Sequence, residues 1–110
     1  MNKTNFILPE DKLFAPSTRL TIMILLLNHK KINFTELQKL LDLTPGNLDH
    51  HVKKLEKAGY VKVYKKLSPL RSPLTFIEVN STGKLSFESY LKNFRNILNK
   101  IKLSSESGEE

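Results

Sequence analysis

The stretch TPGNLDHHVKKLEKAGY, residues 44–60, combines hydrogen-bonding and cationic side chains at helical spacing. Thr44 can cap a helix, Pro45 suits the first helical position, and Gly59 can adopt the left-handed conformation that closes a helix. At about 100° per residue, the apolar side chains gather on one side and the polar or cationic ones on the other. The apolar side comprises Leu48, Val52 and Leu55. The helix predicted over 45–58 is therefore amphipathic, with a polar outer face.

That outer face carries side chains whose chemistry suits double-stranded DNA. An α-helix fits the major groove of B-DNA, and its N-terminal residues usually reach the base edges. Gly46 would allow close approach, Asn47 could pair with adenine, and His50 could bind an acceptor on guanine. Lys53 could contact a guanine or a phosphate, whereas Lys57 lies where a phosphate is the expected partner. The predicted recognition residues are Thr44, Pro45, Gly46, Asn47, Asp49, His50, Lys53, Lys54 and Lys57.

Positive charge is concentrated in this helix and just after it. The net charge is +7, and residues 50–71 hold seven basic residues against one acid, Glu56. Such a concentrated field favours a polyanionic partner, nucleic acid first, although lysines on an ordinary solvated helix are the alternative. The loop LSPLRSP predicts a projecting wing over 66–73 that sets cations on the DNA backbone or puts Arg71 in a minor groove. The predicted wing residues are Lys62, Lys65, Lys66 and Arg71.

Other chemistries find little support in the sequence. There are no cysteines, which excludes disulfides and cysteine-based sites. His50 and His51 point about 100° apart on a helix, so we expect no metal site, and His51 is predicted to be packed and hydrogen-bonded. No phosphate-binding glycine loop, paired carboxylates or activated nucleophile occurs, so we expect no enzyme and no cofactor. The longest apolar run, residues 22–27, is far shorter than the roughly 20 residues of a membrane span, and we expect a cytoplasmic protein that contacts no membrane.

The flanking segments predict the elements that position this helix. A helix capped by Ser17 or Thr18 should run to about residue 29, and its apolar surface must be covered all round. A short extended piece over 31–34 precedes a second helix, which Thr35 would cap. The buried face of that second helix is predicted to be Leu37, Leu40 and Leu41. Two strands are predicted after the recognition helix, over 60–66 and 74–79.

The last predicted helix, from residues 80–82 to about 103, carries an apolar seam at spacings of four, three, four and three. We expect the small core to be too full to cover it, although packing on its own domain alone is the alternative. A second copy would cover the seam, and the twofold dimer would place two recognition helices about one turn of DNA apart. The predicted dimer-interface residues are Leu20, Ile24, Phe87, Tyr90, Leu91, Phe94, Ile97, Leu98 and Ile101.

These residues together resemble a known family. The segment 34–66, a wing, and 75–91 are similar to small winged-helix transcriptional regulators of the MarR/ArsR-like type, especially a short prokaryotic and archaeal group. The motif residues are Leu43, Thr44, Gly46, Asn47, Leu48, His51, Leu55, Glu56, Gly59, Tyr60 and Val61. The resemblance covers 17–91 and implies a dimeric DNA-binding regulator whose third helix reads the groove. Where the family usually has Leu-Thr-x-x-Gly-Arg, this chain has Val79, Asn80, Gly83 and Lys84, which leaves the cap to Asn80 or Ser81.

The expected fold is α+β and mainly α, a winged helix-turn-helix in the order α-β-α-α-β-β-α with a long C-terminal dimerisation helix. We expect an N-terminal arm over 1–16, with one helical turn near 11–14, and a DNA-binding domain over 17–79. The dimerisation helix would occupy 80–103, and a disordered acidic tail 104–110. The expected partners are pseudo-palindromic double-stranded DNA and a second copy. A weakly selective architectural DNA-binding protein and a winged-helix protein-interaction module are the rival functions. The sequence specifies no effector.

Overall fold

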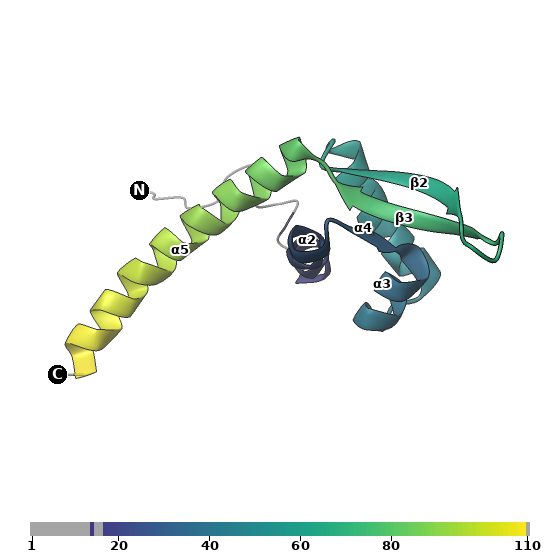
Figure 1. Ribbon diagram of the computed structural model, residues 1–110. Coiled ribbons are helices and arrows are strands. Elements are labelled where there is room, and N and C mark those ends of the chain that lie inside the picture. Colours follow the sequence, from purple (N-terminus) through teal and green to yellow (C-terminus); the bar gives the residue numbers. More distant parts are fainter. Residues whose placement is uncertain (1–13, 15–16, 110) are drawn as a thin grey trace.

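The structure, a computed structural model, describes residue 14 and residues 17–109, with side chains as far as residue 101. The N-terminal arm predicted over 1–16 lies outside these residues except for Phe14, which is helical and buried. The elements are α2 (Ser17–His29), β1 (Lys31–Asn33), α3 (Phe34–Leu41), α4 (Pro45–Lys57), β2 (Val61–Leu67), β3 (Pro73–Val79) and α5 (Ser81–Glu109). This is the predicted order, and the predicted winged helix-turn-helix fold class is confirmed (Figure 1).

The three strands form one antiparallel sheet in the order β1-β3-β2, with the helices α2, α3 and α4 on one side of it (Figure 1). Val61 pairs with Val79 and Val63 with Ile77. Because side chains alternate across a strand, these residues share the face that packs on the helices. The residues between them, Lys62 and Glu78, therefore belong to the opposite, outer face, as do Tyr64 and Phe76.

A single core joins the helices to the sheet. Burial of its apolar side chains is the main force that holds the helices to the inner face of the sheet. The buried apolar residues are Phe14, Ile22, Met23, Leu26, Ile32, Leu37, Leu48, Val52, Leu55, Val61, Ile77, Val79 and Phe87. The buried stripe predicted for α4 is confirmed in full, since Leu48, Val52 and Leu55 are all at most 2% exposed.

Two predictions about α3 are wrong. Asn33, and not Thr35, caps this helix, because its Oδ1 accepts a hydrogen bond from the Glu36 N–H at 2.8 Å. The helix consequently starts at Phe34, two residues earlier than a Thr35 cap would allow. Leu40 is 59% exposed, whereas Leu37 is fully buried. A helix of two turns presents one narrow side to the core, and Leu40 lies on the flank of that side.

The helix α5 begins at a tightly built junction with the turn between α4 and β2. The Asn80 Oδ1 accepts from the Gly83 N–H at 2.7 Å, while its Nδ2 donates to the Gly59 carbonyl at 2.8 Å. Asn80 is thus the cap, which decides between the two predicted residues. A Cβ atom on Gly83 would lie 2.1 Å from the Tyr60 carbonyl oxygen, so only glycine allows this approach. The start of α5 is therefore fixed to the end of α4.

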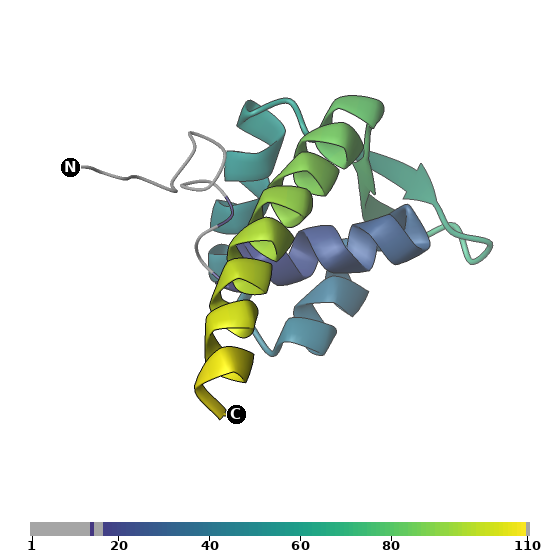
Figure 2. The same cartoon turned by 90° about the vertical axis from the view of Figure 1, so that its left-hand side faces the viewer.

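Beyond this junction α5 extends away from the sheet and past the other helices (Figures 1 and 2). Its 29 residues correspond to about 43 Å of helix. The helix runs past the predicted end near residue 103 and includes 104–109, which the sequence predicted to be disordered. The small polar residues of this segment favour helix weakly, but extending an existing helix requires no new nucleation.

Candidate nucleic-acid interface

The N-terminus of α4 is built as its sequence predicts. Thr44 is the N-cap in an extended conformation, with φ −71° and ψ 155°, and its Oγ1 accepts from the Asn47 N–H at 3.2 Å. Pro45 occupies the first turn, where its missing N–H leaves no donor unsatisfied. At the other end Gly59 has φ +83°, the left-handed conformation that follows a helix. These local signals fix both ends of the helix.

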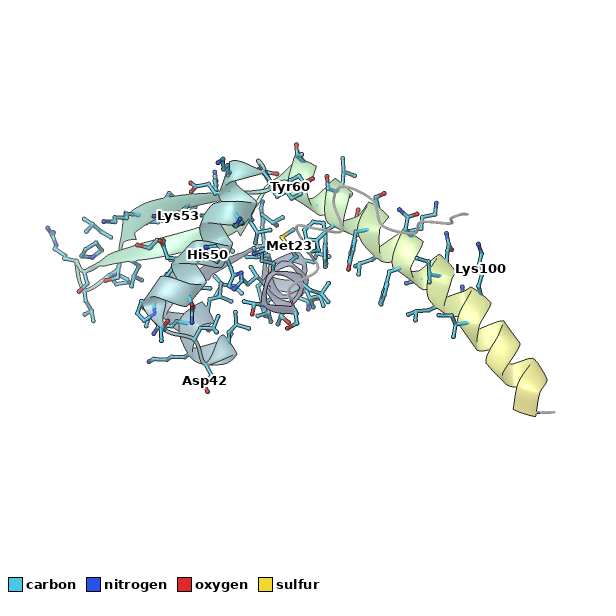
Figure 3. All side chains as sticks on the ribbon, turned by 180° about the vertical axis from the view of Figure 1, so that it is seen from behind. Met23, Asp42, His50, Lys53, Tyr60 and Lys100 are labelled. Carbon is cyan, nitrogen blue, oxygen red and sulfur yellow. The ribbon has the colours of Figure 1, made fainter. Side chains whose placement is uncertain are left out.

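The outer face of α4 is open to a partner. Its residues Thr44, Pro45, Gly46, Asn47, His50, Lys53, Lys54 and Lys57 are all exposed. Apart from its chain neighbours and the backbone of its own helix, no described atom lies within 4 Å of a Cβ built on Gly46. Seen from behind, α4 with His50 and Lys53 lies in front of the sheet, while the β2–β3 hairpin and α5 extend to opposite sides (Figure 3). A long partner could therefore meet the helix and the hairpin together.

Asp49, the acid among the predicted recognition residues, pairs with a neighbouring lysine. Its Oδ2 lies 3.0 Å from Lys53 Nζ, one helical turn away. An exposed pair of this kind contributes little stability, on the order of 0.3–0.5 kcal/mol. The carboxylate instead holds the ammonium group over the middle of the outer face, beside the shallow hollow lined by His50, Lys53, Lys54 and Lys57.

Behind the outer face, His51 is held by a buried arginine from α2. The Nη1 of Arg19 donates to His51 Nδ1 at 2.9 Å, and Arg19 is only 7% exposed. A guanidinium only donates hydrogen bonds, so His51 accepts through an unprotonated Nδ1 and carries its proton on Nε2. Burial, then the charges of Arg19 and His50, hold the pKa of His51 below its usual value of 6.5. The packed, hydrogen-bonded role predicted for His51 is confirmed.

Arg19 is a residue that the sequence analysis missed. Its signal was a lone cation at the start of an otherwise apolar helix, a pattern that indicates a buried partner. The partner could not be named from the sequence, because 32 positions separate the two residues. The contact ties α2 to the inner side of α4 and so fixes the direction of its outer face.

The β2–β3 hairpin forms the predicted wing, and its tip is a hydrogen-bonded turn. The Arg71 N–H donates to the Ser68 carbonyl at 2.8 Å, and the Ser68 N–H donates to the Ser72 carbonyl at 2.8 Å. The Ser68 Oγ accepts from the Ser72 N–H at 3.1 Å. Arg71 has φ +66°, a conformation that usually belongs to glycine in such a hairpin loop. The tip is thus rigid and holds an arginine in a strained conformation.

The lysines of β2 do not form one surface. Lys62 and Lys66 project from the outer face of the sheet, whereas Lys65 shares the inner face with Val61 and Val63. The ammonium of Lys62 lies 5.4 Å from the centre of the Tyr64 ring. The sequence predicted that Lys62 extends the charge of α4, but the strand turns it to the other side.

The outer face of the sheet is organised by its own contacts. The Tyr64 hydroxyl donates to Glu78 Oε1 at 2.9 Å, and its ring stacks on Phe76. This hydrogen bond, and then the charges of nearby lysines such as Lys62, lower the pKa of Glu78. The same bond raises the pKa of the Tyr64 hydroxyl.

The residues predicted for a dimer interface divide into two groups. Phe87 is fully buried by its own chain, with its ring centre 5.1 Å from that of Phe14, so no part of it can meet a second copy. Leu20, Tyr90, Leu91 and Ile97 are half-buried. The exposed members are Ile24, Phe94, Leu98 and Ile101, between 42% and 60% exposed. Three of these lie on the part of α5 that extends from the body.

Among the described residues, no three His, Cys, Asp or Glu side chains gather in a way that could hold a metal ion. None of the described helices has the length and apolarity that crossing a membrane requires.

The arrangement agrees with known proteins. A family model described as "Winged helix DNA-binding domain" matches residues 18–98. An uncharacterized protein of Methanocaldococcus jannaschii is 36% identical over 80 residues, which cover 73% of this chain and 86% of that protein. A transcriptional regulator homologue from Pyrococcus horikoshii has 37% identity and a TM-score of 0.77, with 82% of this chain and 88% of that chain covered.

A more distant structure shows the same fold. The transcriptional regulator BldR from Sulfolobus solfataricus has 18% identity and a TM-score of 0.65, over 83% of this chain and 64% of that one. The resemblance to MarR/ArsR-like regulators read from the sequence is confirmed. The chain belongs to the family of winged helix DNA-binding domains, and it is a winged helix-turn-helix protein of the type found in archaeal and bacterial transcriptional regulators.

Proposed function

We propose that the protein is a dimeric, sequence-specific regulator of transcription that inserts α4 into the major groove of double-stranded DNA. The observation that carries this proposal is the exposed polar face of α4, fully uncovered by the described residues and anchored from behind by a buried apolar stripe. A helix mounted in this way can enter a groove without rearrangement of the domain. The free domain is therefore ready to bind.

Within this face the residues divide between base reading and backbone binding. Asn47 and His50 lie in the first two turns, which reach deepest into a groove, and Gly46 beside them leaves room for the approach. Lys54 and Lys57 lie in the last turn and suit phosphates. Each good base contact is worth about 1–3 kcal/mol of discrimination, and the phosphate contacts supply affinity that falls with salt.

The wing would bind beside the helix, on the backbone or in the adjacent minor groove. Placing Arg71 at φ +66° costs about 1 kcal/mol relative to glycine. Such strain points to a functional requirement for the side chain. A guanidinium at the tip of a rigid hairpin suits the negative potential of a narrow minor groove.

A second copy would bind through the exposed seam of α5. Phe94, Leu98 and Ile101 recur one helical turn apart and are about half exposed in one chain. Two such seams would bury each other, and the twofold axis would put two α4 helices on half-sites about 34 Å apart. The DNA site would then be pseudo-palindromic.

A gel-shift series tests the binding surface. The operator is first selected from fragmented genomic DNA with the full-length protein. Replacing Lys53 and Lys65 together by alanine should weaken binding at least tenfold and flatten the dependence of affinity on salt. Lys62→Ala is the matched control, because Lys62 projects from the other side of the sheet, and it should bind like the natural protein. If the double variant bound the operator as tightly as the natural protein, this assignment of the binding surface would be refuted.

The architectural alternative predicts a different ratio between the affinity for the selected site and the affinity for random DNA. A weakly selective coat protein binds the selected site and random DNA almost equally at fixed salt. A specific regulator should prefer its own site by a factor of about 10³ or more.

A further inference from the structure

The tip of the wing exposes an apolar side chain for which the proposed function gives no role. Leu70 is 88% exposed, the highest value among the exposed large apolar residues that the structure describes. Leu67, at the end of β2, is 65% exposed. An isolated exposed leucine is common on protein surfaces. Its setting is what distinguishes Leu70.

That setting is a rigid one. Leu70 lies between Pro69, whose ring fixes φ, and Arg71, whose N–H closes the turn onto Ser68. Two more hydrogen bonds join Ser68 and Ser72 across the base of the loop. The leucine is therefore presented at the end of a stiff hairpin that projects from the body (Figure 1). Little conformational entropy remains to be lost when it meets a partner.

Charge indicates what that partner is. Arg71 is the next residue, and Lys65 and Lys66 lie at the end of β2 that leads into the loop. The only acid between residues 61 and 79 is Glu78, which lies at the opposite end of the sheet and accepts the Tyr64 hydroxyl. An apolar tip ringed by cations matches a minor groove, where apolar sugar and base surfaces lie between two rows of phosphates. Proteins that bend DNA use leucine and similar side chains as wedges there.

We infer that Leu70 is a wedge that enters the minor groove beside Arg71 and partly unstacks the base step on which it presses. This inference rests on the proposed function and adds a residue that determines specificity. Pyrimidine–purine steps such as TA and CA unstack most easily, so the wing would favour them without any hydrogen bond to a base. Arg71 would bind the groove, and Leu70 would select the step by its deformability.

The experiment uses the full-length protein and the selected DNA duplex with 2-aminopurine at the step beneath the wing. A donor and an acceptor dye at the two DNA ends report bending. The natural protein should raise 2-aminopurine fluorescence and shorten the distance between the ends. Leu70→Ala should lose both signals and bind about tenfold more weakly. Leu70→Met should keep both signals, and Leu85→Ala, which removes a leucine that is 66% exposed elsewhere, should change nothing.

The outcomes separate the two proposals. If the natural protein binds no DNA, both the proposed function and the wedge are overturned. If it binds while Leu70→Ala binds and bends the duplex equally well, only the wedge is overturned. A third arm uses vesicles of phosphatidylserine and phosphatidylcholine, because an exposed leucine among cations also suits an anionic membrane surface. Loss of vesicle binding in Leu70→Ala, with DNA bending unchanged, would assign the tip to lipid and overturn the wedge.

Discussion

The junction between α4 and α5 allows a sharp test of the fold. A Cβ atom at Gly83 would lie 2.1 Å from the Tyr60 carbonyl oxygen, whereas ordinary contacts begin at 3.4 Å. The atoms that it meets belong to the backbone, so no side chain can rotate away. Gly83→Ala therefore forces α5 to move by about 1.3 Å relative to the turn after α4.

The cost can be worked out from the contacts at this junction. A displacement of that size stretches the 2.7 Å bond from the Gly83 N–H to Asn80 Oδ1 and the 2.8 Å bond from Asn80 Nδ2 to Gly59. Loss of a helix cap costs about 1 kcal/mol, and overpacking costs about 1–3 kcal/mol. Alanine gains back about 1 kcal/mol of helix propensity over glycine. We expect a net loss of about 2 kcal/mol in the free energy of unfolding, or about 10 °C in Tm for a domain of this size.

Circular dichroism at fixed protein concentration measures both quantities, since the proposed dimerisation would make Tm depend on concentration. The matched control is Gly46→Ala in α4, where an added Cβ meets no described atom within 4 Å. It should leave stability unchanged or raise it by up to about 1 kcal/mol, while weakening DNA binding by blocking close approach to the groove. If Gly83→Ala were as stable as Gly46→Ala, the geometry of this junction would be wrong.

Two other predictions concern acidity and assembly. Because the pKa of His51 is lowered on folding, the unfolded chain takes up this proton first as the pH falls below about 6.5, and the free energy of unfolding decreases from there towards the folded pKa. Urea titrations at pH 7 and pH 5 should show that His51→Gln, which can still accept from Arg19, loses less free energy of unfolding between the two pH values than the natural protein. An unchanged difference would contradict a half-buried, neutral imidazole at this position. Phe94→Asp combined with Leu98→Asp should give folded monomers by light scattering, because both side chains are about half exposed in one chain, whereas Asn96→Asp should leave the dimer intact. A dimer that survives the double change would place the interface elsewhere.

Local signals account for the parts of the fold that the sequence predicted well. Thr44, Pro45 and Gly59 begin and end α4 through contacts with residues at most four positions away. The ends of α4 can therefore be predicted from the local sequence alone. The buried stripe of α4 repeats with the helical period, and the structure keeps it intact. The Asn80 cap likewise depends on its neighbour three positions away.

Predictions failed where a second element decides the outcome. Arg19 donates a hydrogen bond to His51, which is 32 positions away in the chain, and no pattern in either helix predicts that contact. Leu40 is apolar but lies on the flank of a two-turn helix, where the core does not reach. By contrast, the sequence alone could have predicted that Lys62 and Lys65 lie on opposite faces of β2. Side chains alternate along a strand, and these two residues are an odd number of positions apart. The prediction failed because the lysines were considered as one run of charge.

The most direct test of the central claim is dimethyl sulfate protection of guanine N7 atoms, which lie in the major groove, on the selected DNA. With α4 in the groove, protected guanines should form two patches about one helical turn apart, and His50→Ala should restore reactivity at matching positions in both. Tight, specific binding that leaves every N7 reactive would show that this helix does not read the major groove.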